Sequence, residues 1–244
     1  MEVIVVSVEI SQVKKQFHKD VVLEDINLTV KKGKIFGLIG PSGCGKTTLI
    51  KVIVGMLKVD HGQVVVLNKK VPTFDLLKNI GYMAQSDALY TDLTGFENLQ
   101  FFAKLYGTSK KNRAEQIAYA AEVVQLTDHL KRKVQDYSGG MKRRLSLAIA
   151  LIQNPEILIL DEPTVGIDPA LKKTIWKELQ RLRDDEQKTI FITTHVMDEA
   201  EKCDELALMR EGKIIAQGTP KALKTTFDAE NFDEVFLKAG GYQS

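Results

Sequence analysis

The stretch KIFGLIGPSGCGKTTLI, residues 34–50, contains the pattern that decides the fold. It begins with a short apolar segment, continues through a glycine-rich loop from Gly40 to Thr47, and ends in residues that favour a helix. The loop fits the pattern G-x-x-x-x-G-K-S/T, in which small residues let backbone N–H groups surround phosphates. Lys46 is expected to neutralise the β- and γ-phosphates, and Thr47 to offer its hydroxyl to Mg²⁺. The stretch therefore predicts a strand, a phosphate loop and a helix, in that order.

Apolar segments of strand length alternate with helical patterns along the rest of the chain. The predicted strands span residues 3–10, 24–30, 34–40, 62–68, 156–163 and 188–195, with a hairpin over 205–218 that turns at Glu211 and Gly212. The predicted helices span residues 45–56 and 168–185, several within 96–144, and one or two turns near 197–203. Strands that alternate with helices around a phosphate loop indicate an α/β core with a mainly parallel sheet. The first strands and the hairpin predict an antiparallel β subdomain, and the helices of 96–144 predict an inserted helical subdomain.

Composition limits the class of protein. The chain has 244 residues, of which 44% are hydrophobic, and a net charge of +2, which gives no reason to expect a nucleic-acid partner. Cys44 and Cys203 are far apart and have no metal-binding spacing, which favours a reducing cytoplasm over a disulfide framework. No apolar run reaches the roughly 18 residues of a membrane helix, and the N-terminus lacks the basic start of a signal peptide. We therefore expect a soluble chain that reaches a membrane only through a partner.

Positive charge is concentrated in one segment. Residues 104–144 contain ten basic and four acidic residues, a net charge of about +6. Two interpretations stay open, a solvated helical face and a surface that docks a partner or anionic lipid.

Two further features point to phosphate chemistry. Asp161 and Glu162 follow an apolar strand, where an aspartate can hold Mg²⁺ through its water shell and the next acid can polarise an attacking water. An ordinary pair of loop carboxylates is the alternative, and the phosphate loop makes it the weaker one. Ser138, Gly139 and Gly140 begin a predicted helix, and such a helix start attracts anions. The chain thus has a second candidate phosphate site besides its phosphate loop.

These motifs follow one another as they do in the nucleotide-binding subunits of ATP-binding cassette (ABC) transporters, which the chain resembles over about residues 3–220. The resemblance assigns ATP to the loop Gly40, Pro41, Ser42, Gly43, Cys44, Gly45, Lys46, Thr47 and the following Thr48. It implies that Asp161 and Thr47 hold Mg²⁺, and that Glu162 is the catalytic base. YSGGM, residues 137–141, matches the family signature, with Ser138 and Gly140 as nucleotide contacts.

Four other positions match the family. Gln85 in GYMAQ corresponds to the glutamine that contacts Mg²⁺ and the attacking water and senses the membrane subunit. Asp168 in GIDP corresponds to the D-loop aspartate, and His195 to the switch histidine that contacts the γ-phosphate. Phe17 stands where the family stacks an aromatic ring on adenine, although a core role for it is equally open. The chain departs from the common pattern at Phe17, Ala84, Tyr137 and Met141.

The resemblance implies a phosphate-loop NTPase (RecA-like) core, with the β subdomain, in residues 1–85 and 153–222. The helical subdomain spans 86–152 and a short tail 223–244. The resemblance also implies that two cassettes pair head-to-tail when ATP binds, as a homodimer or with a second ATP-binding subunit, and that each signature covers the ATP held by the other chain. The implied partner is a transmembrane permease, with the cassette on the cytoplasmic side of the membrane. Short sequence motifs such as YSGGMKRRL and PTVGIDP are similar to those of the type-2 exporter branch. This similarity implies export of drugs, lipids or other small molecules.

The segment from Gln85 to Tyr106 is expected to dock the permease. It is rich in apolar and aromatic residues (Leu89, Tyr90, Phe96, Phe101, Phe102 and Tyr106). The alternative is that these rings fill the core of the helical subdomain, and for Phe101 and Phe102 this alternative is at least as strong.

Other classes of phosphate-loop protein fit less well. Soluble ABC proteins of translation usually carry two cassettes and those of DNA repair a long coiled-coil insertion, whereas this chain has one cassette and a compact insertion. A phosphate-loop kinase or GTPase leaves Ser138, Gly139, Gly140 and His195 unexplained. A nucleotide-binding module without catalysis is expected to lack Lys46 or Glu162, and both are present.

Overall fold

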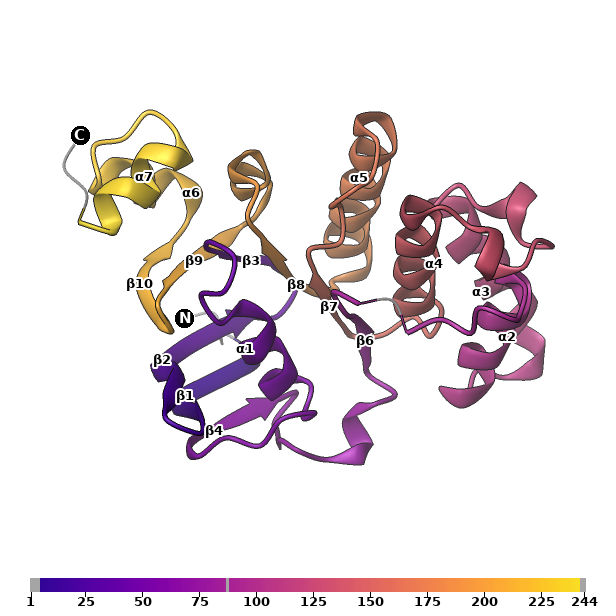
Figure 1. Ribbon diagram of the computed structural model, residues 1–244, viewed down its shortest axis with the longest axis horizontal. Coiled ribbons are helices and arrows are strands. Elements are labelled where there is room, and N and C mark those ends of the chain that lie inside the picture. The colour runs from indigo at the N-terminus through magenta and orange to yellow at the C-terminus, as the bar shows by residue number, and fades with distance from the viewer. Residues whose placement is uncertain (1–4, 87, 242–244) are drawn as a thin grey trace. The chain divides into compact units, whose positions relative to one another are not determined.

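In a computed structural model of the chain, residues 5–86 and 88–241 are described, and they form two compact units. Of the described residues, unit 1 comprises 5–74 and 189–241, and unit 2 comprises 75–86 and 88–188 (Figure 1). Each unit contains part of the expected α/β core. The finer subdomain boundaries predicted from the sequence, at residues 86, 153 and 223, stay predictions.

Unit 1 contains an antiparallel sheet with the strand order β2-β1-β4-β5. Its strands are β1 (Val6–Phe17), β2 (Asp20–Lys31), β4 (His61–Val66) and β5 (Lys69–Lys70). β1 starts near the predicted position but runs past Ile10 to Phe17, because its pairing with β2 continues after the apolar pattern has ended. The predicted start, Val3–Ile4, lies outside the described residues. This sheet confirms the antiparallel β subdomain expected from the first strands. The prediction that the hairpin of 205–218 belongs to it is wrong, because β9 (Glu205–Arg210) pairs with β3 (Ile35–Ile39) in the other sheet.

The parallel strands of unit 1 carry the phosphate loop. β3 (Ile35–Ile39) pairs in parallel with β8 (Thr189–Thr194) on one side and with β9 (Glu205–Arg210) on the other. All residues of β3 and β8 are buried, as expected for strands covered on both faces. The predicted hairpin is formed by β9 and β10 (Lys213–Gly218), and Glu211 and Gly212 both have positive φ at its turn.

The helices of unit 1 are short. α1 (Lys46–Ile53) follows the loop and buries Leu49, Ile50 and Ile53. The predicted turns after His195 form the 3₁₀ segment η4 (Met197–Lys202). Two helices, α6 (Pro220–Thr226) and α7 (Phe232–Ala239), end the described chain, and α7 contacts η4.

Unit 2 contains two parallel strands and the longest helix. β6 (Ile80–Met83) pairs with β7 (Ile157–Asp161), in which every residue is buried. α5 (Pro169–Glu186) buries the predicted apolar face, Leu171, Ile175, Leu179 and Leu182, together with Trp176. The short 3₁₀ turn η1 (Phe74–Leu76) precedes β6.

Three helices form the expected helical insertion in unit 2. α2 (Gly95–Leu105), α3 (Lys110–Val123) and α4 (Gly139–Leu151) contact one another, and the 3₁₀ turns η2 (Thr127–His129) and η3 (Val134–Asp136) connect α3 to α4 (Figure 1). Thr94 and Glu97 form a capping box at the start of α2, which satisfies two backbone donors at once. Leu99 and Ala103 of α2 are fully buried, so the core of this group lies on that face of α2.

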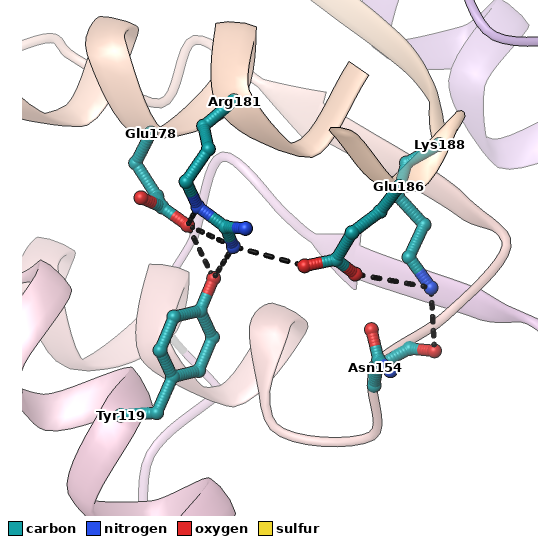
Figure 2. A network of polar contacts seen from close by, with 6 residues as sticks. All are labelled: Tyr119, Asn154, Glu178, Arg181, Glu186 and Lys188. Carbon is teal, nitrogen blue, oxygen red and sulfur yellow. Dashed lines mark hydrogen bonds and ion pairs between the residues drawn. The ribbon is translucent and has the colours of Figure 1, made fainter. Parts of the chain in front are cut away.

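A polar network joins α3 to the C-terminal half of α5. The hydroxyl of Tyr119 donates to Glu178 Oε1 (2.5 Å), which also accepts from Arg181 Nε (2.9 Å). Arg181 Nη2 donates to Glu186 Oε1 (2.9 Å), and Lys188 Nζ donates to the backbone oxygen of Asn154 (3.2 Å) (Figure 2). Burial, and the hydrogen bond to Glu178, raise the pKa of Tyr119. The network therefore fixes the helical insertion against α5 within unit 2.

No helix within residues 5–86 and 88–241 is long and apolar enough to cross a membrane.

Candidate functional site

The phosphate loop lies between the buried strand β3 and the helix α1. A Cβ on Gly40 would stand 2.2 Å from the backbone oxygen of Met209, so β9 leaves room for glycine alone. Gly45, the N-cap of α1, has φ 110°, and a Cβ there would stand 2.9 Å from the backbone oxygen of Val22. The two glycines that define the pattern are therefore required by the packing of unit 1.

Lys46 lies inside the loop. Its side chain is buried, and its Nζ donates to the backbone oxygens of Gly40 (2.7 Å) and Pro41 (3.1 Å). The backbone N–H of Gly212, at the β9–β10 turn, donates to the backbone oxygen of Cys44 (3.0 Å). The ammonium group is thus held against the loop, where a phosphate bound by the loop would meet it.

The start of α1 suits an anion. Its N-cap residue makes no side-chain capping hydrogen bond, and no acidic residue lies in its first turn. A helix N-terminus carries about half a positive charge, and backbone N–H groups point out of it. Lys46, Thr47 and Thr48 form this first turn, as the sequence predicts.

His195 lies at the same edge of the sheet as the loop. In the parallel register Ile39 of β3 faces Thr194 of β8, and the residues that follow them are Gly40 and His195. Neighbouring strands stand about 4.8 Å apart. His195 is exposed, so unit 1 brings the predicted switch histidine and the start of the phosphate loop together.

Phe17 is a surface residue at the end of β1. Its side chain is 42% exposed, and the ammonium group of Lys15 lies 5.4 Å from the ring centroid. The core role that the sequence left open for Phe17 is therefore wrong. An exposed ring is what stacking on a base requires, and the adenine contact itself stays a prediction.

In unit 2, the predicted residues Gln85, Asp161 and Glu162 lie where the strands β6 and β7 end. β7 ends at Asp161, which is fully buried, and Glu162 follows with a left-handed backbone (φ 52°). β6 runs parallel to β7, with Met83 facing Leu160, so Gln85 follows β6 at the edge where β7 ends. Burial and the Asp161 carboxylate raise the pKa of Tyr82, on β6, to about 12.

The predicted Mg²⁺ ligands have suitable chemistry. Thr47 offers a hydroxyl, Gln85 an amide oxygen and Asp161 a carboxylate, and oxygen atoms are what Mg²⁺ takes. Among the described ranges 5–86 and 88–241, no group of three or more His, Cys, Asp or Glu side chains forms a metal site by itself. A donor set with one carboxylate fits an ion that completes its shell with water and substrate phosphates.

The signature residues form the start of α4. Ser138 is the N-cap, and its Oγ accepts from the backbone N–H of Met141 (3.2 Å). A Cβ on Gly139 would meet nothing within 4 Å, so packing within the chain does not require glycine there. On Gly140 a Cβ would stand 3.2 Å from the backbone oxygen of Gly166. Ser138 and Gly139 are exposed, which leaves this helix start open to a ligand from outside unit 2.

Asp168 has a structural role that the sequence prediction missed. It is the N-cap of α5, and its Oδ1 accepts from the backbone N–H of Leu171 (3.0 Å). Its predicted contact with nucleotide stays a prediction. Tyr137, one of the departures from the family pattern, is buried, and its hydroxyl donates to the backbone oxygen of His129 (2.8 Å). The larger residue is thus accommodated by a hydrogen bond within the helical insertion.

The helical spacing of the apolar residues Met141, Leu145, Ala148 and Leu151 predicts that Arg143 lies on the opposite face of the helix, and this prediction is wrong. The helical pattern puts it on a solvated basic face with Lys142 and Arg144, but its side chain is buried and contacts the backbone around Gln85 and Glu162. One signal was available, because Arg143 lies four residues before Leu147 and seven before Ala150, on a buried stripe of α4.

Comparisons with known proteins agree with this arrangement. The sequence model of the family described as "ABC transporter" matches residues 23–165. The chain is 40% identical to the Nod factor export ATP-binding protein I of Rhizobium sp. (strain N33), over 89% of this chain and 72% of that protein. It is 38% identical to the probable multidrug ABC transporter ATP-binding protein YbhF of Escherichia coli (strain K12), over 89% of this chain and 38% of YbhF.

Two solved structures of ABC transporter ATP-binding proteins have a fold similar to that of this chain. One described as the ATP-binding subunit of an ABC transporter has a TM-score of 0.89 and 25% identity, over 96% of this chain and 99% of that one. The dimeric structure of MJ0796, a bacterial ABC transporter cassette, has a TM-score of 0.82 and 26% identity, over 87% and 98% of the two chains.

Proposed function

Because this chain belongs to the ATP-binding subunits of ABC transporters, we propose that it energises a separate transmembrane permease from the cytoplasmic face of a membrane. It is the ATP-hydrolysing subunit of an exporter. The observation that carries the proposal is the 40% identity to an export ATP-binding protein over 89% of the chain. We propose small molecules as cargo, of the drug or lipid class, since the relatives are named for export of Nod factors and of multiple drugs.

The proposed chemistry uses two groups of residues, the phosphate loop and its neighbours in unit 1 and the residues Gln85, Asp161 and Glu162 in unit 2. The loop of unit 1 binds the phosphates of ATP through backbone N–H groups and Lys46, with Phe17 against the base. In unit 2, Glu162 accepts the proton of the attacking water, and Gln85 orients that water. Mg²⁺, when bound by Asp161 and Thr47, supplies positive charge to the β- and γ-phosphate oxygens. His195, beside the start of the loop, contacts the γ-phosphate.

We also propose that two copies of this chain pair head-to-tail, with ATP between them. ABC ATPases form dimers, and MJ0796 has been solved as one. In this chain the start of α4 is exposed, its glycine at 139 is not required by internal packing, and its helix end attracts an anion. The γ-phosphate held by the partner chain supplies that anion. This is the role of the second phosphate site that the sequence predicts.

A variant of Ser138 tests this pairing. Glu162→Gln with ATP is expected to run as a dimer in solution, and Glu162→Gln with Ser138→Arg as a monomer, because a bulky cation replaces the cap that faces the phosphate. Mass from light scattering gives the result. Ser109→Arg is the matched control, since Ser109 caps α3 through the same contact, from Asn112 N–H to its Oγ.

The dimer with the Ser109→Arg change should persist. If the Ser138→Arg double variant still dimerises as well as Glu162→Gln alone, the signature is only a tight helix start and the head-to-tail proposal is wrong. ATP binding by the phosphate loop should be intact in all of these variants.

The permease-docking surface is proposed on α2 and the segment before it. Four rings contact one another in sequence: Tyr90 and Phe101 have centroids 4.8 Å apart, Phe101 and Phe102 5.3 Å, and Phe102 and Tyr106 6.2 Å. Tyr90 is 48% exposed and Phe101 39%, while Phe102 is half-buried. The core alternative is therefore wrong for Phe101, while for the half-buried Phe102 it stays open. The exposed rings offer an aromatic surface that a partner can cover.

Cysteine cross-linking tests the docking surface. Cys44 and Cys203 are the chain's two cysteines and both are buried, so an added cysteine at Phe101 provides an exposed thiol. Phe101→Cys is expected to cross-link to the co-expressed permease, whereas Lys177→Cys, exposed on α5, is not. Cross-links at Lys177→Cys alone would overturn the docking proposal.

A further inference from the structure

Arg143 is a buried cation that contacts four backbone oxygens. Its side chain is 8% exposed, in the second turn of α4. Nη1 donates to the oxygens of Ala84 (2.7 Å) and Gln85 (2.9 Å). Nη2 donates to the oxygens of Asp161 and of Glu162 (2.8 Å). One guanidinium group therefore joins the signature helix to the backbone at the ends of β6 and β7.

The four oxygens are two pairs with a common feature. The carbonyls of Ala84 and Gln85 belong to the peptide planes on either side of the Gln85 Cα, and those of Asp161 and Glu162 to the planes on either side of the Glu162 Cα. The φ and ψ angles of Gln85 and Glu162 describe how the two planes of each pair are rotated about the Cα atom between them. By holding both planes of each pair, Arg143 fixes the direction in which each side chain leaves the backbone.

Glu162 needs such support more than most residues. Its φ of 52° lies in the left-handed region, which a residue with a Cβ rarely adopts without a local reason. β6 and β7 pair only as far as Met83 and Leu160, so this pairing offers no partner to the carbonyls of Ala84, Gln85 and Glu162. The planar guanidinium, with N–H groups in a fixed fork, supplies donors to both segments at once.

We propose that Arg143 is the positioning residue for Gln85 and Glu162, which it holds in the orientation that ATP hydrolysis requires. The proposal rests on the roles proposed above for those two residues. Because Arg143 lies five residues after Ser138 on the same helix, it also joins the backbone that carries the attacking-water residues rigidly to the start of α4. No step of the reaction requires Arg143 to contact nucleotide.

Arg143→Lys is the variant that tests the proposal. Lysine keeps the charge but has a single nitrogen, which cannot span both pairs of carbonyls. We expect kcat for ATP hydrolysis to fall roughly 10- to 100-fold, the size of effect that a small misplacement of reacting groups produces. KM and the Kd for ATP should change less than about 2-fold, because the phosphate loop is untouched. Turnover is divided by the fraction of chain that binds a fluorescent ATP analogue, so unfolded protein is not counted.

The matched control is Arg144→Lys, at the next position of the same helix. Arg144 also donates to two backbone oxygens, those of Val124 (3.3 Å) and Gln125 (3.2 Å), at the end of α3. It should keep the wild-type kcat, because its partners are not site residues. An equal fall in kcat for both variants would mean that any loss of helix anchoring slows turnover, and it would overturn the proposal.

A double variant separates this proposal from the one on which it rests. If Arg143 acts through Gln85 and Glu162, adding Arg143→Lys to Glu162→Gln should lower kcat by a smaller factor than Arg143→Lys does alone, because only the effect through Gln85 remains. An equal factor in the two backgrounds would overturn the positioning role. Wild-type turnover by Glu162→Gln would reject the role of Glu162 itself. A large loss in Glu162→Gln together with wild-type kcat in Arg143→Lys, or a raised KM alone, would reject the positioning role and leave that of Glu162 intact.

Discussion

Replacing Glu162 by glutamine is expected to leave ATP binding intact and to slow hydrolysis by about 10²–10⁴-fold. Glutamine has nearly the same shape but lacks the carboxylate that takes a proton from water. The contact that holds the backbone here, from Arg143 Nη2 to the Glu162 oxygen, does not involve the replaced side chain. The loss should therefore appear in the chemical step, measured as phosphate release in a single turnover of bound ATP.

Glu156→Gln is the matched control. Glu156 is an exposed carboxylate immediately before β7, the strand that Glu162 follows, and its Oε1 accepts from Asn79 Nδ2 (2.7 Å). This variant should hydrolyse ATP at the wild-type rate. If Glu162→Gln does so as well, another group accepts the proton and the assignment of Glu162 is wrong.

Replacing Lys46 by alanine should nearly abolish turnover and weaken ATP binding. The ammonium group is the positive charge held inside the loop, and loss of one such contact to developing charge costs about 10²–10³-fold in rate. Alanine also removes the hydrogen bonds from Nζ to Gly40 and Pro41, which hold the loop closed. Both the Kd, from titration with an ATP analogue, and steady-state phosphate release should therefore change.

Lys51→Ala provides the comparison for Lys46→Ala. Lys51 is exposed in the last turn of α1, so this variant removes one positive charge from the same helix without touching the loop. It should bind and hydrolyse ATP as the wild type does. Near wild-type turnover by Lys46→Ala would remove Lys46 from the site.

Local sequence predicted most of the strands, because most of the parallel strands are short runs of apolar residues that no solvated helix would tolerate. Ile157–Leu160 and Ile190–Ile192 are such runs, and both are buried strands. The parallel strand β6 was not predicted, because its four residues include Gly81 and Tyr82. Strand ends were less predictable. β1 continues to Phe17 because β2 folds back beside it, and that pairing depends on residues elsewhere in the chain.

Whether each aromatic residue lies in the core or on the surface was also decided only by the tertiary structure. Phe17, Phe101 and Phe102 carry the same side chain as Phe36, which is fully buried and stacks on Phe191 with centroids 5.4 Å apart. A phenylalanine fits a core and a binding surface equally well in a sequence. Its place is decided by which neighbours cover it, as Leu99 and Ala103 show by taking the buried side of α2.

By itself, the sequence determined the phosphate loop and the order of the other motifs, because their chemistry depends on residues close together in the chain. Only the tertiary structure decided which positions support them. Arg143 looks like a solvated cation beside Lys142 and Arg144, yet it is buried because the ends of β6 and β7 present carbonyls that need a donor. Those carbonyls come from positions 58 and 19 residues away in the chain. No local pattern around Arg143 records a contact that the folded backbone creates at such separations.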